Sequence, residues 1–188
     1  MSAEYTFNQL KKDVADGSID TVLVCQIDMQ GRLMGKRFTG THFVESAHKE
    51  THSCNYVQAT DMEMHTVEGY AATSWASGYG DYTMTPDLST LRRVPWLEAT
   101  ALVLCDVSDH ATHSDVAHSP RAILKKQIAR LEDHGYRAFM ATELEFFLFN
   151  QTFESAQQSG YRGLTRSSAY NEDYHILQTT KEEDVMRA

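Results

Sequence analysis

The chain has 188 residues, of which 41% are hydrophobic, enough for one ordinary domain or for one small domain and part of another. Its 26 acidic residues outnumber 17 basic residues, and no block of lysine or arginine offsets the net charge of −9. Nucleic acid and membrane are therefore not expected as partners. No apolar run approaches the roughly 20 residues that span a bilayer, and the first residues lack the apolar stretch of a secretory signal, so we expect a cytoplasmic protein.

The cysteines Cys25, Cys54 and Cys105 are far apart and odd in number, without a Cys-x-x-Cys pair. Disulfides and a structural zinc site are therefore not expected. Cys25 and Cys105 each lie in an apolar run typical of a strand, where we interpret them as small buried hydrophobic side chains.

Capping and turn signals predict the first elements of the chain. Thr6, followed three residues later by Gln9, resembles a capping box and predicts a short N-terminal helix. Residues 21–29 are rich in β-branched side chains, and Gln30-Gly31 separates them from a second run. This pattern predicts two strands joined by a tight turn.

The middle of the chain alternates between regular and irregular segments. A helix capped by Thr41 is expected over residues 41–49, packed on the sheet. Residues 61–87 have no periodicity and are interpreted as a long binding loop, whereas residues 100–107 predict a strand buried on both faces. Four aromatic residues in the loop argue against simple disorder: Tyr70, Trp75, Tyr79 and Tyr82.

A polar connection separates this part from a helix. Residues 108–119 lack periodicity, and a domain boundary is expected there. Their three histidines, His110, His113 and His118, fit no known ligand spacing, so a solvated linker is preferred to a metal site. Ser119 and Pro120 have the residue types of an N-cap and first helical position, and an apolar stripe then predicts a helix ending at Gly135.

A pair of glutamates carries the clearest chemical signal. Glu143 and Glu145 precede four large apolar residues, 146–149, which together predict a strand. Both carboxylates would leave the same face, about 7 Å apart at their roots. They could belong to the solvated face of an edge strand. The apolar run instead favours a central strand, where paired carboxylates need neutralising cations such as Mg²⁺ or Mn²⁺.

The segment ELEFFLF resembles the acidic strand E-x-E-F-F-L-F of the glutamine synthetase family. Other segments follow the order of that family: a strand pair, a loop with a tryptophan, TMTPDLST, the strand ALVLCDV, and S-P-R opening a helix. The stretch YRGLTRSSAYNEDYHI resembles the residues that lead to the family's nucleotide site. The resemblance covers nearly the whole chain, and the common order makes a chance similarity improbable.

The resemblance implies an α+β fold, with an N-terminal β-grasp domain over residues 1–108 and the truncated start of a catalytic domain, an antiparallel sheet with helices, over residues 119–188. Family members form homo-oligomeric rings in which the N-terminal domain of one subunit closes the active site of the next. They are more than twice as long as this chain, so we do not expect it to catalyse on its own. The competing interpretation is an inactive truncated relative that serves as a structural or assembly unit.

The resemblance also implies the chemistry, which is phosphorylation of the γ-carboxylate of glutamate by ATP followed by amidation with ammonia or an amine. Glu143 and Glu145 would each hold a different Mg²⁺ or Mn²⁺ ion, and Tyr174 would lie near the nucleotide phosphates. Trp75 and Asp81 would bind substrate in a neighbouring subunit's site, with Asp81 as the catalytic carboxylate that holds ammonium and accepts a proton. Alternatively, Trp75 anchors its own loop and Asp81 caps a turn. The altered spacing upstream of Trp75 favours an amine over ammonia.

Overall fold

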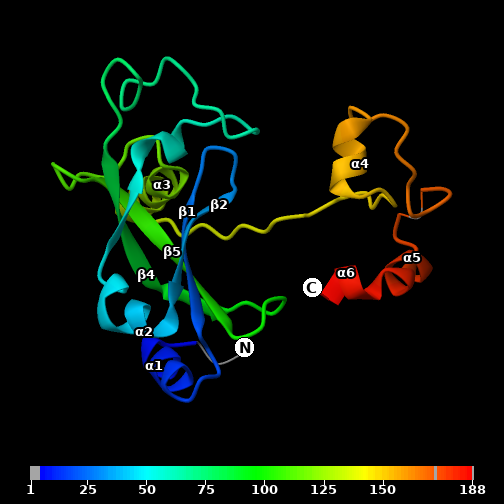
Figure 1. The fold of residues 1–188 in the computed structure, drawn as a ribbon, viewed down its shortest axis with the longest axis horizontal. Coiled ribbons are helices and arrows are strands. Elements are labelled where there is room, and N and C mark those ends of the chain that lie inside the picture. Colours follow the sequence, from blue (N-terminus) through cyan, green and yellow to red (C-terminus); the bar gives the residue numbers. More distant parts are fainter. Residues whose placement is uncertain (1–4, 172, 188) are drawn as a thin grey trace. The chain divides into compact units, whose positions relative to one another are not determined.

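The structure, a computed structural model, describes residues 5–171 and 173–187. The chain separates into two compact units, Met1–Ala138 and Phe139–Ala188, which are described separately below (Figure 1). No helix among the described residues is long and apolar enough to cross a membrane. The domain boundary predicted at residues 108–119 stays a prediction.

A five-stranded mixed sheet forms the centre of unit 1, with the strand order β2-β1-β5-β4-β3. β1 is antiparallel to β2 and parallel to β5, and β4 lies antiparallel between β3 and β5. The predicted strand pair and the predicted strand at residues 100–107 are confirmed. The strands are β1 (Thr21–Ile27), β2 (Leu33–Thr39), β3 (Thr51–Cys54), β4 (Asp81–Arg93) and β5 (Thr100–Asp109).

Short helical segments accompany the sheet: α1 (Phe7–Ala15), α2 (Gly40–His42), the π-helical turn η1 (Phe43–Ala47) and the 3₁₀ turn η2 (Asn55–Gln58). Thr6 caps α1 as predicted, because its side chain accepts a hydrogen bond from the backbone N–H of Gln9 at 3.2 Å. The predicted second helix is present, but Thr39 rather than Thr41 caps it, through the N–H of His42 at 3.3 Å.

The hydrophobic core is formed by side chains of the sheet together with those of α1 and η1. Cys105 belongs to this core and Cys25 to a smaller buried cluster, as predicted, and burial raises the pKa of the Cys105 thiol to about 12. The main buried side chains of the core are Leu10, Ile19, Val22, Val24, Phe43, Met84, Ala101 and Val103. This core fixes the sheet from which the long loop before β4 extends.

The long loop predicted over residues 61–87 is shorter in the structure. It ends at Gly80, because Asp81 already pairs with β3 and residues 82–87 pair with β5 as the first half of β4. Three consecutive residues, Tyr82, Thr83 and Met84, are buried, and Pro86 and a register shift after Asp87 further interrupt the alternation of a strand. Because these irregularities break the alternation of buried and exposed residues, periodicity did not predict this strand.

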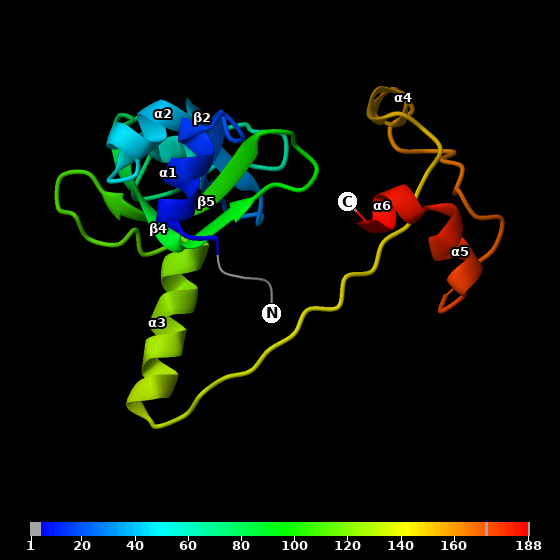
Figure 2. The same ribbon diagram turned by 90° about the horizontal axis from the view of Figure 1, so that it is seen from below.

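The helix α3 (Pro120–Asp133) begins on the sheet and projects away from it (Figure 2). As predicted, Ser119 is its N-cap residue, Pro120 is its first residue, and Gly135 follows its end. Arg121 binds the carboxylates of both Asp87 and Asp106, with 2.8 Å between its Nε and Asp106 Oδ1. The segments TMTPDLST and S-P-R therefore meet in space. The apolar stripe of α3 is solvent-exposed within the structure: Ile123, Leu124, Ile128 and Leu131.

The described residues of unit 2 form three short helices, α4 (Phe153–Gln158), α5 (Ile176–Lys181) and α6 (Glu183–Arg187). The strand predicted through residues 143–149, and with it the antiparallel sheet, is absent from the part of unit 2 that the structure describes. Residues 136–148 have no regular secondary structure, and the nearest feature is an isolated bridge between Phe149 and Arg166. A strand requires a neighbouring strand for its backbone hydrogen bonds. Among the described residues of this unit, the pairing of this segment is limited to the bridge at Phe149.

Asp13 joins α1 to the end of β4 and gives unit 1 a dependence on pH. Its carboxylate is 6% exposed and accepts hydrogen bonds from Tyr5 Oη at 2.7 Å, Gln9 Nε2 at 2.8 Å and Arg93 Nη2 at 2.8 Å. The hydrogen bond from Tyr5 is the largest of the effects that lower its pKa, followed by those from Arg93 and Gln9.

Since the folded-state pKa is below the unfolded-state value, the stabilisation by Asp13 is complete above about pH 4 and is lost as the pH falls through the folded value. Asp13→Asn is expected to reduce the free energy of unfolding by about 1–3 kcal/mol at pH 7 and to make it less dependent on pH below 4. Urea unfolding at pH 7 and pH 3 measures both effects, with exposed Asp133→Asn as the control. Parallel pH profiles for the two variants would contradict this assignment.

Candidate active-site elements

Trp75 is presented at a tight turn in the loop of residues 61–80. Ser74 and Gly78 close the turn through an isolated bridge. The indole is 75% exposed and meets the ring of Tyr79 edge to face, with 5.1 Å between the ring centroids. An indole this exposed is better suited to contact a partner than to anchor its own loop in a core.

Asp81 stands where this loop returns to the sheet. It is the first residue of β4, paired with Cys54 of β3, and the preceding carbonyl of Gly80 accepts a hydrogen bond from Asn55 N at 2.8 Å. The Asp81 carboxylate is exposed, and among the described residues it makes no hydrogen bond or ion pair. It therefore does not cap a turn here, and its oxygens are accessible to a ligand.

The buried side chain of Asn55 holds the second half of the loop. Its Nδ2 donates to the carbonyl oxygen of Ala72 at 3.3 Å, and its Oδ1 accepts from Thr73 Oγ1 at 2.9 Å. Both Asn55 and Thr73 are buried. The backbone immediately before Trp75 is thus fixed to the 3₁₀ turn η2.

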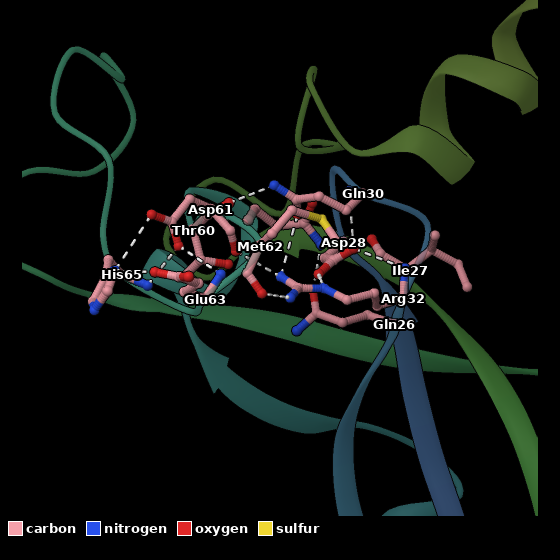
Figure 3. A network of polar contacts seen from close by, with 11 residues as sticks. Gln26, Ile27, Asp28, Gln30, Arg32, Thr60, Asp61, Met62, Glu63 and His65 are labelled. Atoms are coloured by element: carbon pink, nitrogen blue, oxygen red, sulfur yellow. Dashed lines mark hydrogen bonds and ion pairs between the residues drawn. The ribbon is translucent and has the colours of Figure 1, made fainter. Parts of the chain in front are cut away.

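The turn between β1 and β2 holds the beginning of the loop (Figure 3). Three consecutive carbonyl oxygens, those of residues 60–62, accept hydrogen bonds from this turn. Gln30 Nε2 donates to the first at 2.7 Å, and Arg32 donates to the second at 2.9 Å and the third at 2.7 Å. Sequence reasoning did not find this contact, because a polar turn signal does not reveal a partner 30 residues away.

Asp61 is engaged within the loop itself. Its Oδ1 accepts from the backbone N–H groups of Glu63 and His65, each at 2.9 Å. The hydrogen bond from His65 N is the largest of the effects that lower the pKa of Asp61. The carboxylate therefore stabilises the turn at residues 61–65.

Two of the predicted linker histidines have defined surroundings. His110 Nδ1 lies 3.2 Å from Thr83 Oγ1, and its ring meets that of His52 edge to face at a centroid distance of 4.9 Å. His118 packs near Tyr82, and burial lowers its pKa. The solvated-linker interpretation was therefore wrong for His118, which is partly buried.

Glu145 and Tyr174 line the same hollow in unit 2, which has a volume of about 600 Å³. Its wall also contains Arg166 and Asn171. Tyr174 has a φ of 57°, a left-handed conformation that is uncommon for an aromatic residue, and its side chain is 92% exposed. Glu143 is not part of the wall. Of the three residues predicted to bind metal or nucleotide, the structure therefore brings together Glu145 and Tyr174.

The predicted metal ligands have suitable chemistry but form an incomplete site. Glu143 and Glu145 are exposed in an extended segment, and carboxylate oxygens are the donors that Mg²⁺ and Mn²⁺ prefer. The described residues contain no group of three or more histidine, cysteine, aspartate or glutamate side chains that could hold a metal ion. An octahedral ion at either glutamate would need further oxygen donors.

Comparison with known proteins identifies relatives along nearly the whole chain. Residues 117–188 match the family model for the glutamine synthetase catalytic domain. Gamma-glutamylethanolamide synthetase GlnA4 of Streptomyces coelicolor is 47% identical over 175 residues, which are 93% of this chain and 38% of that protein. A glutamate–isopropylamine ligase of a Pseudomonas species is 35% identical over 170 residues, 90% of this chain and 37% of that protein. The chain thus spans less than two fifths of the length of these relatives.

Solved structures show the same fold class. A structure described as a GmaS/ADP complex matches with a TM-score of 0.50 and 20% identity, covering 66% of this chain and 26% of the other. A novel glutamine synthase homolog matches with a TM-score of 0.52 and 16% identity, covering 62% and 27%. The mixed sheet with its helices is therefore of the glutamine synthetase type. Together with the sequence matches, this shows that the chain belongs to the glutamine synthetase family.

Proposed function

We propose that this chain carries part of the active site of an ATP-dependent ligase that joins the γ-carboxylate of glutamate to an amine. The observation that carries the proposal is the 47% identity with gamma-glutamylethanolamide synthetase over 93% of the chain. The similarity to glutamate–isopropylamine ligase supports it, since both names describe joining glutamate to an amine rather than to ammonia. The altered spacing upstream of Trp75 agrees with the same acceptor class.

We propose a β-grasp domain for residues 1–108 and the beginning of a catalytic domain for residues 119–188. The strand order and the parallel pairing of β1 with β5 support the first assignment, together with the helical segment η1, which packs into the core of the sheet. The family match at residues 117–188 supports the second. In a homo-oligomeric ring, the loop of residues 61–80 would meet the active site of a neighbouring subunit.

The proposed reaction has two steps. A γ-carboxylate oxygen of glutamate attacks the terminal phosphorus of ATP, the bond to ADP breaks, and an acyl phosphate forms. The amine nitrogen then attacks the carbonyl carbon, the bond to phosphate breaks, phosphate leaves, and the nitrogen loses a proton. Divalent ions, when bound, neutralise charge on the phosphates. Glu143 and Glu145 would hold these ions, and Tyr174 would contact the nucleotide.

Trp75 and Asp81 would form the acceptor end of the site. Most amines are protonated at neutral pH, and an exposed indole face and a nearby carboxylate both attract such a cation. Asp81 would then accept a proton from the bound cation, which frees the nitrogen lone pair for attack on the carbonyl carbon. The exposure of both side chains in the structure supports this assignment, because each is accessible from outside its own unit.

A non-catalytic structural or assembly unit is the second candidate. It is favoured by the exposed apolar side chains of unit 2, where Leu144 is 84% and Phe147 is 64% exposed. Side chains of this kind are normally covered by protein. In this alternative the chain contributes contacts to an assembly and no catalytic group.

A chimaera separates the two candidates: this chain replaces the matching residues of the Streptomyces coelicolor enzyme. We expect the chimaera to form γ-glutamylethanolamide and to release one phosphate per amide. Asp81→Asn is expected to lower kcat about 10²–10⁴-fold, because the general base is lost. Glu63→Gln, a change of an exposed carboxylate in the same loop, is the control. Product is followed by mass spectrometry with ethanolamine, isopropylamine and ammonia as acceptors, and a folded but inactive chimaera would support the structural alternative.

A further inference from the structure

The guanidinium group of Arg32 connects two segments that are far apart in the sequence (Figure 3). Its Nη1 donates to the carbonyl oxygen of Met62 at 2.7 Å, and its Nη2 to that of Asp61 at 2.9 Å. Nη2 also lies 3.4 Å from Gln30 Oε1. One side chain of the β1–β2 turn therefore holds the backbone where the loop of residues 61–80 begins.

The other side of the guanidinium is fixed by a fully buried carboxylate. The side chain of Asp28 is 0% exposed and accepts from Arg32 Nε at 2.7 Å. The same carboxylate accepts from the backbone N–H of Gln30 at 2.9 Å and of Arg32 at 2.8 Å. Because the acceptor is held by its own turn, the arginine has a rigid base from which to hold the loop.

The contacts of Arg32 are with backbone carbonyls, so they determine the path of the loop rather than recognise its side chains. Beyond Asp61 the loop turns back at once, since the Asp61 carboxylate caps the turn at residues 61–65. The later part of the loop is fixed independently by Asn55 and Thr73. The position of the first part thus depends on the turn that carries Arg32.

We infer that Arg32 is a positioning residue for the amine end of the proposed active site. It would act by holding the first part of the loop, whose later part carries Trp75 and is held by Asn55, without touching substrate, and this role rests on the proposed function of that loop. Loss of the guanidinium would leave the buried Asp28 carboxylate without its charged partner and the Met62 carbonyl without a donor, while the Asp61 carbonyl would keep only the N–H of Met64 at 3.2 Å. The consequence would be a more mobile loop and weaker binding of the amine.

Amide hydrogen exchange on the 188-residue chain tests the structural half of this inference. In Arg32→Ala, exchange at residues 61–66 is expected to become about 10-fold faster, while exchange in β1 and β5 stays unchanged. Arg32→Lys should restore part of the protection against exchange at residues 61–66, since an ammonium group can replace some of the hydrogen bonds of the guanidinium group. Arg37→Ala, at an exposed arginine of β2, is the control. Unchanged exchange in the loop of Arg32→Ala would overturn the inference.

Kinetics of the chimaera test the functional half. Arg32→Ala is expected to raise KM for ethanolamine about 10-fold and to leave KM for glutamate and for ATP within about 2-fold, with an intermediate value for Arg32→Lys. Equal increases in all three constants would overturn a positioning role. If Arg32→Ala does not fold, Gln30→Ala removes one loop contact and spares the buried pair, and a smaller change in the same direction is expected. An inactive wild-type chimaera would contradict the proposed function, while the exchange experiment would still decide whether Arg32 holds the loop.

Discussion

Gly35→Ala is expected to destabilise unit 1 by about 3 kcal/mol, because β2 has no room for a side chain at this position. A Cβ atom there would lie 2.0 Å from the carbonyl oxygen of Val24 and 3.0 Å from the Cα of Cys25. Both atoms belong to the backbone of β1, which is held between β2 and β5. Neither atom can rotate away as a side chain would, so the pairing of β1 with β2 must open locally.

Urea unfolding followed by circular dichroism measures this effect at pH 7. Lys36→Ala, an exposed neighbour on the same strand, is the matched control and is expected to change the free energy of unfolding by less than about 0.5 kcal/mol. The loop of residues 61–80 is held by the same strand pair through Arg32, so Gly35→Ala should also speed hydrogen exchange in that loop. Equal stabilities of the two variants would mean that β2 can move without cost.

Local signals predicted unit 1 well where the partner of a side chain lies within one turn. Thr6 and Gln9 are three residues apart, and their cap formed as predicted. The β-branched run that precedes Gln30-Gly31 became β1, since its side chains alternate between two covered faces. The cap of the second helix is Thr39 rather than the predicted Thr41, and residue type alone did not distinguish them because both threonines are suitable caps.

Long-range contacts account for what the sequence did not reveal. Arg32 binds carbonyl oxygens about 30 residues later in the chain, and carbonyls carry no sequence signature. The acidic segment with Glu143 and Glu145 was predicted as a strand on its composition, but strand formation depends on a neighbour. The roles of Trp75, Asp81 and Tyr174 came from family resemblance and stay predictions.

Glu143→Ala and Glu145→Ala are each expected to remove one of two Mn²⁺ ions from the chimaera and to lower its ligase activity about 10³-fold. The two carboxylates would hold different ions, so each variant should lose one binding event in a calorimetric titration and keep the other. The loss of activity follows from the several kcal/mol by which a metal ion stabilises charge on a transferring phosphoryl group.

Glu154→Ala, an exposed glutamate in α4 of the same unit, is the control and should retain both ions and full activity. The titration of the 188-residue chain itself answers a separate question. Binding that is lost in both variants would mean that the acidic segment already forms half-sites, although its carboxylates are exposed in the structure. Absence of binding in the wild-type chain would mean that other donors must complete each site. If both variants of the chimaera keep two ions and wild-type activity, Glu143 and Glu145 are not the metal ligands.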